Sequence, residues 1–346
     1  MVTVESYPLA VLMCVITMLC WGSWANTQKL ASKEWKFQLF YWDYSLGVLL
    51  LTIIFAFTLG SMGEAGRGFT ADLSQAEWKY LGYALLGGVI FNIANILLVA
   101  AIDIAGMAVA FPVGIGIALV WGVIETYLNT RVDKPIENPT ILFLGVAVVA
   151  AAIIVNAIAY RKLPTTGQKT TGKGLVISVV AGVLMGRFYP YVTSSIANIK
   201  AIDTVEEAGK LTPYTALVVF ALGLFLSSFV FNTIVMAKPF VGEPVPLGDY
   251  FKKGNPRLHL IGILGGIIWS VGMSLNILAG DTAGYPISYG LGQGATMVAA
   301  FWGVFIWKEF RQAPAGTHKL LGLMFLFFIV GLGMIVYANA HPAGMG

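Results

Sequence analysis

The sequence predicts an all-helical integral membrane protein with ten transmembrane helices, arranged as two inverted five-helix repeats. Three observations predict this class: the composition, the number of long apolar segments and an internal repeat. The 346-residue chain is 58% hydrophobic and 11% charged, which leaves too few polar residues to cover a water-soluble domain. Its mean hydropathy of +0.80 favours the same class.

Apolar segments long enough to cross a bilayer occur ten times. A helix needs about 20 apolar residues to span the hydrocarbon core. The segments of this length are 7–28, 39–60, 80–101, 105–128, 140–160, 174–197, 213–236, 258–279, 284–307 and 318–339. Five of them precede a short polar stretch and five follow it. We therefore expect one repeat over residues 1–163, a cytoplasmic linker over 164–173 and a second repeat over 174–346.

An internal repeat supports this division. The stretch LGGVIFNIANILLVAAIDIAGMAVAFPVGIG at 86–116 recurs as LGGIIWSVGMSLNILAGDTAGYPISYGLGQG at 264–294, 178 positions later. Several glycines and one aspartate keep their spacing through two apolar segments and the turn between them. Such duplication is typical of transporters built from two related halves. Because each half has an odd number of spans, the second half enters the membrane from the opposite side.

The basic residues predict the orientation. Of the 21 Lys and Arg residues, 14 lie in the first, fifth, seventh and ninth connections, six lie in the opposite connections, and Arg187 lies within a span. Cytoplasmic loops carry the excess of Lys and Arg. We therefore expect a multi-pass protein of the plasma (inner) membrane with both termini outside.

The remaining chemistry-bearing residues favour no enzyme, metal or cofactor. Cys14 and Cys20 lie in the first apolar segment, where buried packing is the simplest role for a thiol. The three histidines, His259, His318 and His341, lie at segment ends without metal-ligand spacing. The formal net charge of +4 does not indicate nucleic-acid binding, because the basic residues lie between apolar segments.

Arg187 is the most informative single residue. It lies 13 positions into the sixth predicted span, about 20 Å along a helix that rises about 1.5 Å per residue. A charge near the bilayer midplane is costly and usually functional. We expect Arg187 to line a central cavity; the alternative is a structural arginine satisfied by backbone carbonyls.

Two carboxylates within spans are candidates for carrying a proton. Asp43 lies near the start of the second span and Glu125 near the end of the fourth. The alternative for Asp43 is an interfacial acid paired with Lys36. The duplicated Asp103 and Asp281 each precede a new helix and predict N-caps. A two-aspartate intramembrane protease that uses Asp43 and Asp281 is a weaker alternative.

Polar and aromatic side chains share positions in the two repeats. Asn92 and Ser270 are equivalents, and they follow Phe91 and Trp269. Rings next to amides suit a small polar, planar or ring-shaped solute. Helix-loosening residues also occur in both halves, and discontinuous helices at matching positions point to a transport site. These residues are Pro112, Gly114 and Gly116 in the fourth span and Gly290, Gly292 and Gly294 in the ninth.

Four stretches together resemble the ureide permease family of the drug/metabolite transporter superfamily, close to the glucose/ribose porters. They are WGSWAN at 21–26, YWDYSLGVLL at 41–50, GGVIFNIANIL at 87–97 and AAFWGVFIWKEFR at 299–311. The resemblance implies a ten-helix carrier with a central cavity, commonly importing allantoin, uracil or related compounds with protons. Members with a large central domain carry a P-loop-like motif there. Here GQKTTGKG at 167–174 lacks the final Ser or Thr, so we expect a solvated linker.

We therefore expect a secondary active transporter that imports a ureide or nucleobase, such as allantoin or uracil, with protons and by alternating access. A sugar porter of the same superfamily is the alternative solute class; a passive channel and an intramembrane enzyme are the alternatives outside active transport. The expected partners are the solute, a proton and the lipid bilayer, and the chain is a monomer or homodimer. Asp43 and Glu125 are the proton-coupling candidates. The residues expected to bind the solute are Trp21, Trp24, Asn26, Asn92, Asn95, Arg187, Trp269 and Gln293.

Overall fold

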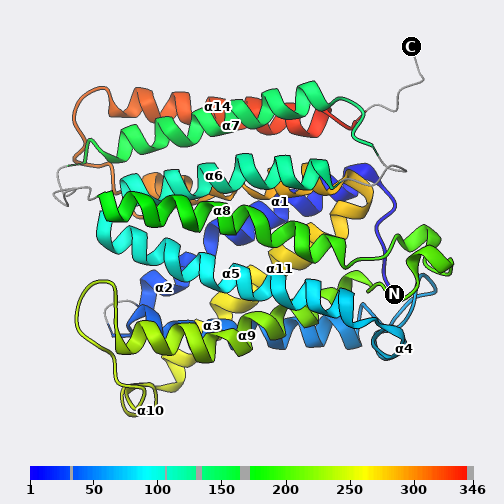
Figure 1. Ribbon diagram of the computed structural model, residues 1–346. Coiled ribbons are helices and arrows are strands. Elements are labelled where there is room, and N and C mark those ends of the chain that lie inside the picture. Colours follow the sequence, from blue (N-terminus) through cyan, green and yellow to red (C-terminus); the bar gives the residue numbers. More distant parts are fainter. Residues whose placement is uncertain (32–33, 106, 130–134, 164–171, 341–346) are drawn as a thin grey trace.

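The computed structural model describes residues 1–31, 34–105, 107–129, 135–163 and 172–340. The described residues form helices and loops, with one isolated bridge between Ile196 and Leu211 in place of any sheet (Figure 1). The expected all-helical class is confirmed. The linker at 164–173, with its P-loop-like stretch, falls largely outside the described residues.

The helices follow the predicted segments within a few residues. In chain order they are α1 (Tyr7–Ser23), α2 (Ala25–Ala31), α3 (Phe37–Phe57), α4 (Phe69–Gln75), α5 (Trp78–Ala105), α6 (Met107–Leu128), α7 (Pro139–Tyr160), α8 (Gly172–Ser194), α9 (Pro213–Ala237), α10 (Asp249–Lys252), α11 (Pro256–Ala283), α12 (Tyr285–Gly292), α13 (Ala295–Phe301) and α14 (Thr317–Tyr337). Short 3₁₀ turns lie at Ile199–Ala201 and Val205–Glu207.

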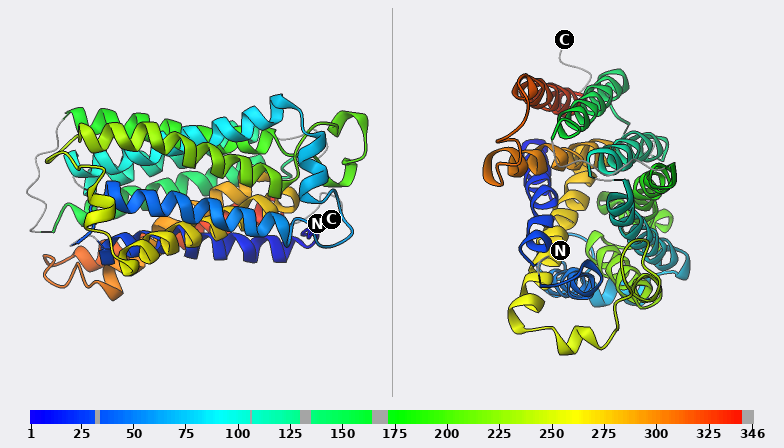
Figure 2. Two further views of the ribbon diagram at one scale, coloured as in Figure 1. Left: turned by 90° about the horizontal axis from the view of Figure 1, so that it is seen from below. Right: turned by 90° about the vertical axis from the view of Figure 1, so that its left-hand side faces the viewer.

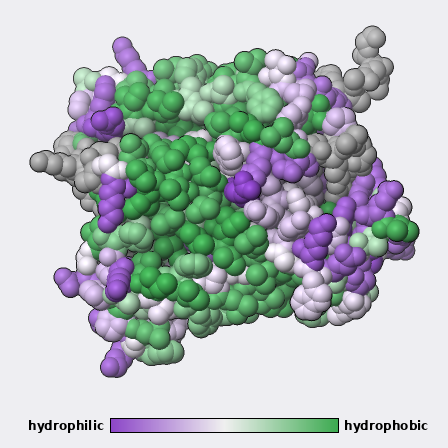
Figure 3. All heavy atoms as spheres, in the orientation of Figure 1, coloured by the Kyte–Doolittle hydropathy of each residue, from purple (hydrophilic) through white to green (hydrophobic). Residues whose placement is uncertain are grey.

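Nine stretches of the described chain are long and apolar enough to cross a membrane. The remaining predicted span, the fourth, corresponds to α6, whose apolar stretch over the described side chains is Pro112–Leu128. Figure 3 shows the consequence on one face, where a broad hydrophobic band separates hydrophilic margins at the two ends of the helices. The protein is therefore a multi-pass membrane protein, and the inverted arrangement of its halves remains a prediction.

The long helices run side by side between two ends of the molecule (Figures 1 and 2). At one end, called the terminal end here, α1 begins and α14 finishes, and the Tyr7 hydroxyl donates to the Val336 carbonyl at 2.5 Å. The opposite end, called the basic end, holds the connections that carry Lys29, Lys238 and Arg311. The side of the membrane that each end faces remains a prediction.

Three spans begin with the same local signal. Asn138, Thr212 and Asn255 each precede a proline, and each side chain accepts a hydrogen bond from the backbone N–H three residues on. The side-chain oxygen satisfies an N–H that the helix leaves free, and proline at the first position needs no such partner. These caps fix the starts of α7, α9 and α11.

Two spans are interrupted and one expected interruption is absent. The first span breaks at Trp24 between α1 and α2, and the ninth breaks at Gln293 and Gly294 before continuing into a π-helical turn at Trp302–Ile306. π-Helical turns are rare and often lie at functional sites. The fourth span, in contrast, continues through Pro112.

The predicted N-cap at Asp281 is wrong. Helix α11 continues through Asp281 to Ala283, and the residue that caps α12 is Gly284. Gly284 has a φ of +91°, a backbone conformation that glycine adopts without steric cost. The turn between the eighth and ninth spans is therefore made by the glycine rather than by the acid. The side chain of Asp103 lies outside the described part.

Glycines bring two helix pairs into backbone contact in the same way. A Cβ atom on Gly266 of α11 would lie 2.0 Å from the Tyr44 carbonyl oxygen of α3. Its repeat equivalent on α5, Gly88, would place a Cβ 2.0 Å from the Phe220 carbonyl oxygen of α9. Such approaches are possible only without a side chain, as is common at helix contacts in membranes. The pairs α3–α11 and α5–α9 are thus built alike.

At the terminal end, an ion pair with a buried carboxylate ties the loop around α4 to the segment before α9. The Arg67 Nε donates to the Asp72 Oδ1 at 3.0 Å, and Arg67 also donates to the carbonyls of Ile202 and Lys210. The other Asp72 oxygen accepts from the Thr212 N–H at 2.7 Å, and the whole Asp72 side chain is buried. One carboxylate therefore holds segments from both halves of the chain.

Replacing Asp72 with alanine is expected to cost about 3 kcal/mol of stability, because it removes the carboxylate partner of the partly buried Arg67 and leaves the Thr212 N–H without its acceptor. The thermal midpoint of the purified protein in detergent measures the loss. Glu64→Ala, an exposed acid in the same loop, is the control and should melt like the wild type. Equal midpoints for the two variants would contradict this role of Asp72.

Candidate functional site

Aromatic side chains from six helices and the break after α1 meet between the helices. This aromatic cluster consists of Trp21, Trp24, Tyr44, Phe91, Phe188, Phe220 and Trp269. Trp269 on α11 is its centre: the Trp269 ring centroid lies 4.5 Å from that of Phe91 and 6.0 Å from those of Trp21 and Phe220. Offset and tilted rings at such distances attract one another beyond the gain from burial alone.

The cluster is built from matching positions of the two halves. Phe91 and Trp269 are repeat equivalents and touch each other. Tyr44 and Phe220 are the residues whose carbonyls receive the glycine contacts of α11 and α5, and both rings approach Trp269. The cluster therefore lies on the boundary between the halves.

Several buried polar atoms on the helices that carry the cluster have no hydrogen-bond partner among the described residues. They include the Tyr44 hydroxyl, the Asn92 Oδ1, the Ser274 hydroxyl and the Asn276 Oδ1. The amide nitrogens of the two asparagines are engaged: Asn92 donates to Ser227 at 2.7 Å and Asn276 to the Ser288 carbonyl at 2.7 Å. A buried polar group without a partner is costly, and a bound solute can supply the partner.

Three of the eight predicted solute residues, Trp21, Trp24 and Trp269, belong to this cluster. The Trp21 indole donates to the Trp269 carbonyl at 3.2 Å, and a Cβ on Gly292, just before Gln293, would lie 2.7 Å from the Trp21 ring. The Trp24 ring lies 4.9 Å from that of Tyr44. The buried Gln293 therefore follows a residue that faces Trp21.

Two predicted amides occupy the edge of this arrangement. The Asn95 amide donates at 3.3 Å to the hydroxyl of Tyr41, whose ring stacks on Tyr44 at 5.3 Å. Asn26 lies on α2, and its oxygen accepts from the Trp307 indole at 2.7 Å. Asn26 thus ties α2 to the end of the ninth span.

Arg187 and Glu125 lie away from the cluster, on the flank of α6 and α8. The Arg187 side chain is 45% exposed, and its guanidinium lies 3.4 Å from the Glu125 carboxylate, which also accepts from Trp121. Because α8 ends at Ser194, Arg187 is about 10 Å from that end, closer to the terminal end than the sequence suggests. In the structure Arg187 thus pairs with Glu125 at a partly exposed position and is not one of the cluster rings.

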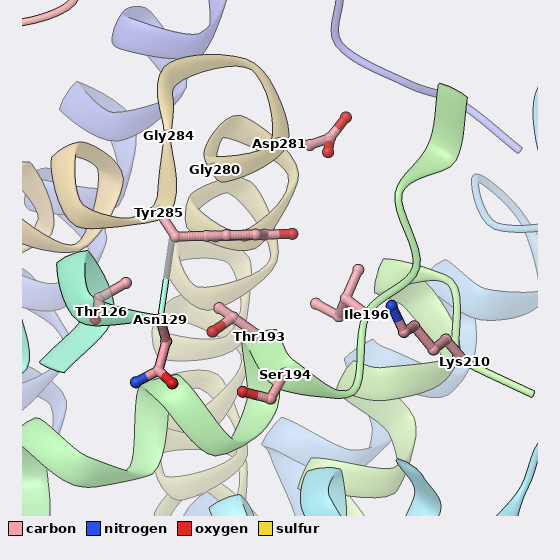
Figure 4. Close-up of a pocket in the computed structure, with 10 residues that line it drawn as sticks. All are labelled: Thr126, Asn129, Thr193, Ser194, Ile196, Lys210, Gly280, Asp281, Gly284 and Tyr285. Atoms are coloured by element: carbon pink, nitrogen blue, oxygen red, sulfur yellow. The ribbon is translucent and has the colours of Figure 1, made fainter. Parts of the chain in front are cut away.

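A pocket of about 220 Å³ opens near the terminal end, where α6, α8 and the α11–α12 turn converge (Figure 4). This volume is below the roughly 300–1,000 Å³ of pockets for drug-sized ligands and suits a small molecule. Figure 4 shows the Tyr285 ring extending across the pocket from the α11–α12 turn, with Thr193 and Ser194 on the α8 side. The lining residues are Thr126, Asn129, Thr193, Ser194, Ile196, Lys210, Gly280, Asp281, Gly284 and Tyr285.

Ring contacts connect this pocket to the aromatic cluster. The Tyr285 ring lies 6.3 Å from that of Tyr189, and Tyr189 lies 6.1 Å from Phe188. Phe188 in turn lies 5.0 Å from Phe91, the neighbour of Trp269. A line of packed rings that includes Tyr189 and Tyr285 therefore joins the pocket to the cluster.

Asp43 belongs to a separate polar group near the basic end. Its carboxylate is 1% exposed, accepts from the Tyr250 hydroxyl at 2.5 Å, and lies 3.0 and 3.1 Å from the His259 Nδ1. The Trp35 ring packs against both His259 and Tyr250. Burial and the hydrogen bond to Asp43 raise the pKa of the Tyr250 phenol, so Tyr250 remains protonated and donates.

The sequence did not identify Tyr250, His259 and Trp35 as neighbours of Asp43. Lys36, the partner in the alternative interpretation, is not the residue that Asp43 contacts. No spacing signal links them, because Tyr250 and His259 follow Asp43 by 207 and 216 positions. Only the close contact of α3 with α11 brings them together: a Cβ on Gly262 would lie 2.4 Å from the Cβ of Asp43.

Fold and site together define a multi-pass helical membrane protein with an aromatic cluster and a small pocket between its helices. The chain belongs to the ureide permease family, whose family model matches residues 40–170 and 160–338. It is 25% identical to ureide permease 1 of Arabidopsis thaliana, over 99% of this chain and all of that protein. The chain is accordingly a membrane transporter of a small-molecule solute.

Two further comparisons broaden this picture. A putative sugar uptake protein of Listeria innocua is 22% identical over 83% of this chain and 88% of its own. A solved crystal structure superposes with a TM-score of 0.60 at 15% identity, over 96% of this chain and 99% of its own, and shows the same fold.

Proposed function

We propose that the protein is a secondary active transporter that imports a planar ureide or nucleobase, such as allantoin or uracil. One observation carries the proposal: the aromatic cluster lies between the halves, on helices that also hold buried polar atoms without partners. A flat heterocycle stacks its faces on the rings and offers N–H and carbonyl groups to those atoms. The named ureide permeases of Arabidopsis thaliana support this solute class.

Matched helix contacts support an inverted repeat and alternating access. Helix α11 packs on α1 and α3, and its repeat equivalent α5 packs on α8 and α9. Likewise α8 packs on α6, and α1 packs on α12 and α13. Two similar halves that meet at one solute site are able to open toward each side in turn. We assign the basic end to the cytoplasm, which places both termini outside the plasma membrane.

A sugar is the second candidate solute, because one relative is named a putative sugar uptake protein. The aromatic cluster favours the planar solute over it. A sugar carries a hydroxyl on nearly every carbon and needs many hydrogen-bond partners, whereas rings dominate this site. We propose no enzymatic activity, since the named ureide permeases are transporters.

Counterflow in proteoliposomes tests the proposal. Vesicles containing the purified protein and unlabelled allantoin or uracil are diluted into a trace of the same labelled solute. We expect transient accumulation of label, with no competition from glucose, ribose or xylose. Counterflow of sugars alone would make the protein a sugar porter, and label entry that external solute neither saturates nor inhibits would indicate a channel.

Arg187→Ala is expected to reduce solute counterflow by less than about fivefold, or about 1 kcal/mol, because Arg187 pairs with Glu125 and is not one of the cluster rings. Initial rates per amount of reconstituted protein measure the effect. A loss of transport in a variant that folds normally would restore the role that the sequence suggests for Arg187.

A further inference from the structure

We propose that Asp43 and His259 form the proton-coupling site of the transporter, with His259 passing the proton between Asp43 and water at the basic end. This inference rests on the proposed function and assigns the coupling step to named atoms. Its basis is geometric: a fully buried carboxylate is in contact with a partly exposed imidazole, at the point where α3 and α11 cross.

The exposure of the two partners differs in the direction that a relay requires. The Asp43 side chain is 1% exposed and the His259 side chain 28% exposed. The imidazole Nδ1 faces the carboxylate, while the Nε2 faces Gly254, where an added Cβ would lie 2.3 Å away. The absence of a side chain at residue 254 therefore allows the Nε2 edge of the imidazole to pack closely against the backbone of this residue.

Release of the proton follows from this arrangement. A protonated Asp43 gives its proton to the Nδ1 of a neutral His259 that carries hydrogen on Nε2, and the Nε2 proton leaves to water. The products are an Asp43 carboxylate and a neutral imidazole whose Nδ1–H donates to it, so one proton has moved and charge balances. A neutral imidazole carries its hydrogen on either ring nitrogen, which suits such a relay.

Other ionisable groups on the surrounding elements are Asp249 and Lys253, which pair at 2.7 Å, and Lys36, Lys252 and Arg257 near helix ends. Among the described hydrogen bonds and ion pairs, none of these groups contacts Asp43. The partners recorded for the carboxylate are His259 and Tyr250. Glu125 fits the coupling role less well, because it pairs with Arg187 on the exposed flank.

The proposed coupling site and the solute cluster share two helices. Asp43 lies between Tyr41 and Tyr44 on α3, and His259 precedes Trp269 by ten residues on α11, about 15 Å along the helix. An ionised carboxylate holds its donors by charge-assisted hydrogen bonds, which weaken when it is protonated. A proton on Asp43 therefore loosens the α3–α11 crossing that also supports Trp269.

The test compares Asp43→Asn with the wild type in two proteoliposome assays: counterflow without a gradient, and accumulation driven by a pH gradient, inside alkaline. We expect Asp43→Asn to keep counterflow but lose gradient-driven accumulation by about tenfold or more, since positioned proton-transfer groups contribute about 10²–10⁴-fold. Glu125→Gln is the matched control and should keep both activities. Gly254→Ala, which places a methyl group against the His259 Nε2, should slow gradient-driven uptake and leave the counterflow rate unchanged.

The outcomes separate this inference from the proposed function. Absence of wild-type counterflow for allantoin and uracil would overturn the proposed solute class. Wild-type counterflow without gradient-driven accumulation would overturn proton coupling and with it this site. Gradient-driven accumulation by Asp43→Asn would overturn the assignment of Asp43 and would leave the proposed function standing. Loss of both activities in a variant that melts like the wild type would make Asp43 part of solute binding and also overturn the assignment.

Discussion

Trp269→Ala is expected to reduce solute counterflow at least about 100-fold, because the substitution removes the ring on which the aromatic cluster is centred. Four cluster rings lie within 6.4 Å of the Trp269 centroid, so its loss disturbs contacts from both halves. The initial counterflow rate, normalised to reconstituted protein, is the measurement.

Controls separate loss of the site from loss of the fold. Truncating a buried tryptophan costs about 3–5 kcal/mol, so the thermal midpoint must be measured alongside transport. Trp269→Phe keeps a ring at the position and should retain a measurable rate. Trp78→Ala, at a side chain that is 88% exposed, should leave transport unchanged. Wild-type transport by a folded Trp269→Ala variant would remove the cluster from the solute site.

Gly88→Ala and Gly266→Ala are expected to be the most destabilising single substitutions of this kind. Each new Cβ would lie 2.0 Å from a backbone carbonyl oxygen of the neighbouring helix, and a backbone cannot move aside as a side chain can. The two helices must separate, which also parts the rings that they carry. The yield of monodisperse protein and its thermal midpoint in detergent measure the damage.

Gly82→Ala provides the matched control, because it lies on α5 with Gly88 and an added Cβ would meet nothing within 4 Å. This control should melt at or slightly above the wild-type temperature, since alanine favours the helix. Because Gly88 and Gly266 are repeat equivalents, Gly88→Ala and Gly266→Ala should lower the thermal midpoint by similar amounts. A Gly88→Ala protein that melts like Gly82→Ala would refute the close packing of α5 on α9.

The positions of the spans followed from the sequence because apolar length alone determines which segments can cross a bilayer. The sequence did not show which face of each helix packs against its neighbours. Phe188 and Phe220 lie in segments that are apolar on every side, so no periodicity marks the side that meets Trp269. Trp21, Trp24 and Trp269 were found because they belong to recognisable motifs or to the repeat.

The polar residues show a second limit. The sequence identified Asp43 as a carboxylate within a span. It did not identify Tyr250 and His259 as the partners of Asp43, because they lie more than 200 positions away. Counting along one helix placed Arg187 near the midplane, but it did not show that the Glu125 carboxylate on another helix comes within 3.4 Å of the guanidinium. Pairing depends on how helices are rotated, and rotation is determined by tertiary packing.

A structure of the protein with bound allantoin or uracil tests the central claim most directly. We expect the heterocycle to stack within the aromatic cluster, against Trp269, with its polar edge toward buried groups such as the Tyr44 hydroxyl or the Asn92 oxygen. A solute bound away from Trp269, for example on the exposed flank beside Arg187, would contradict the assignment of the cluster as the transport site.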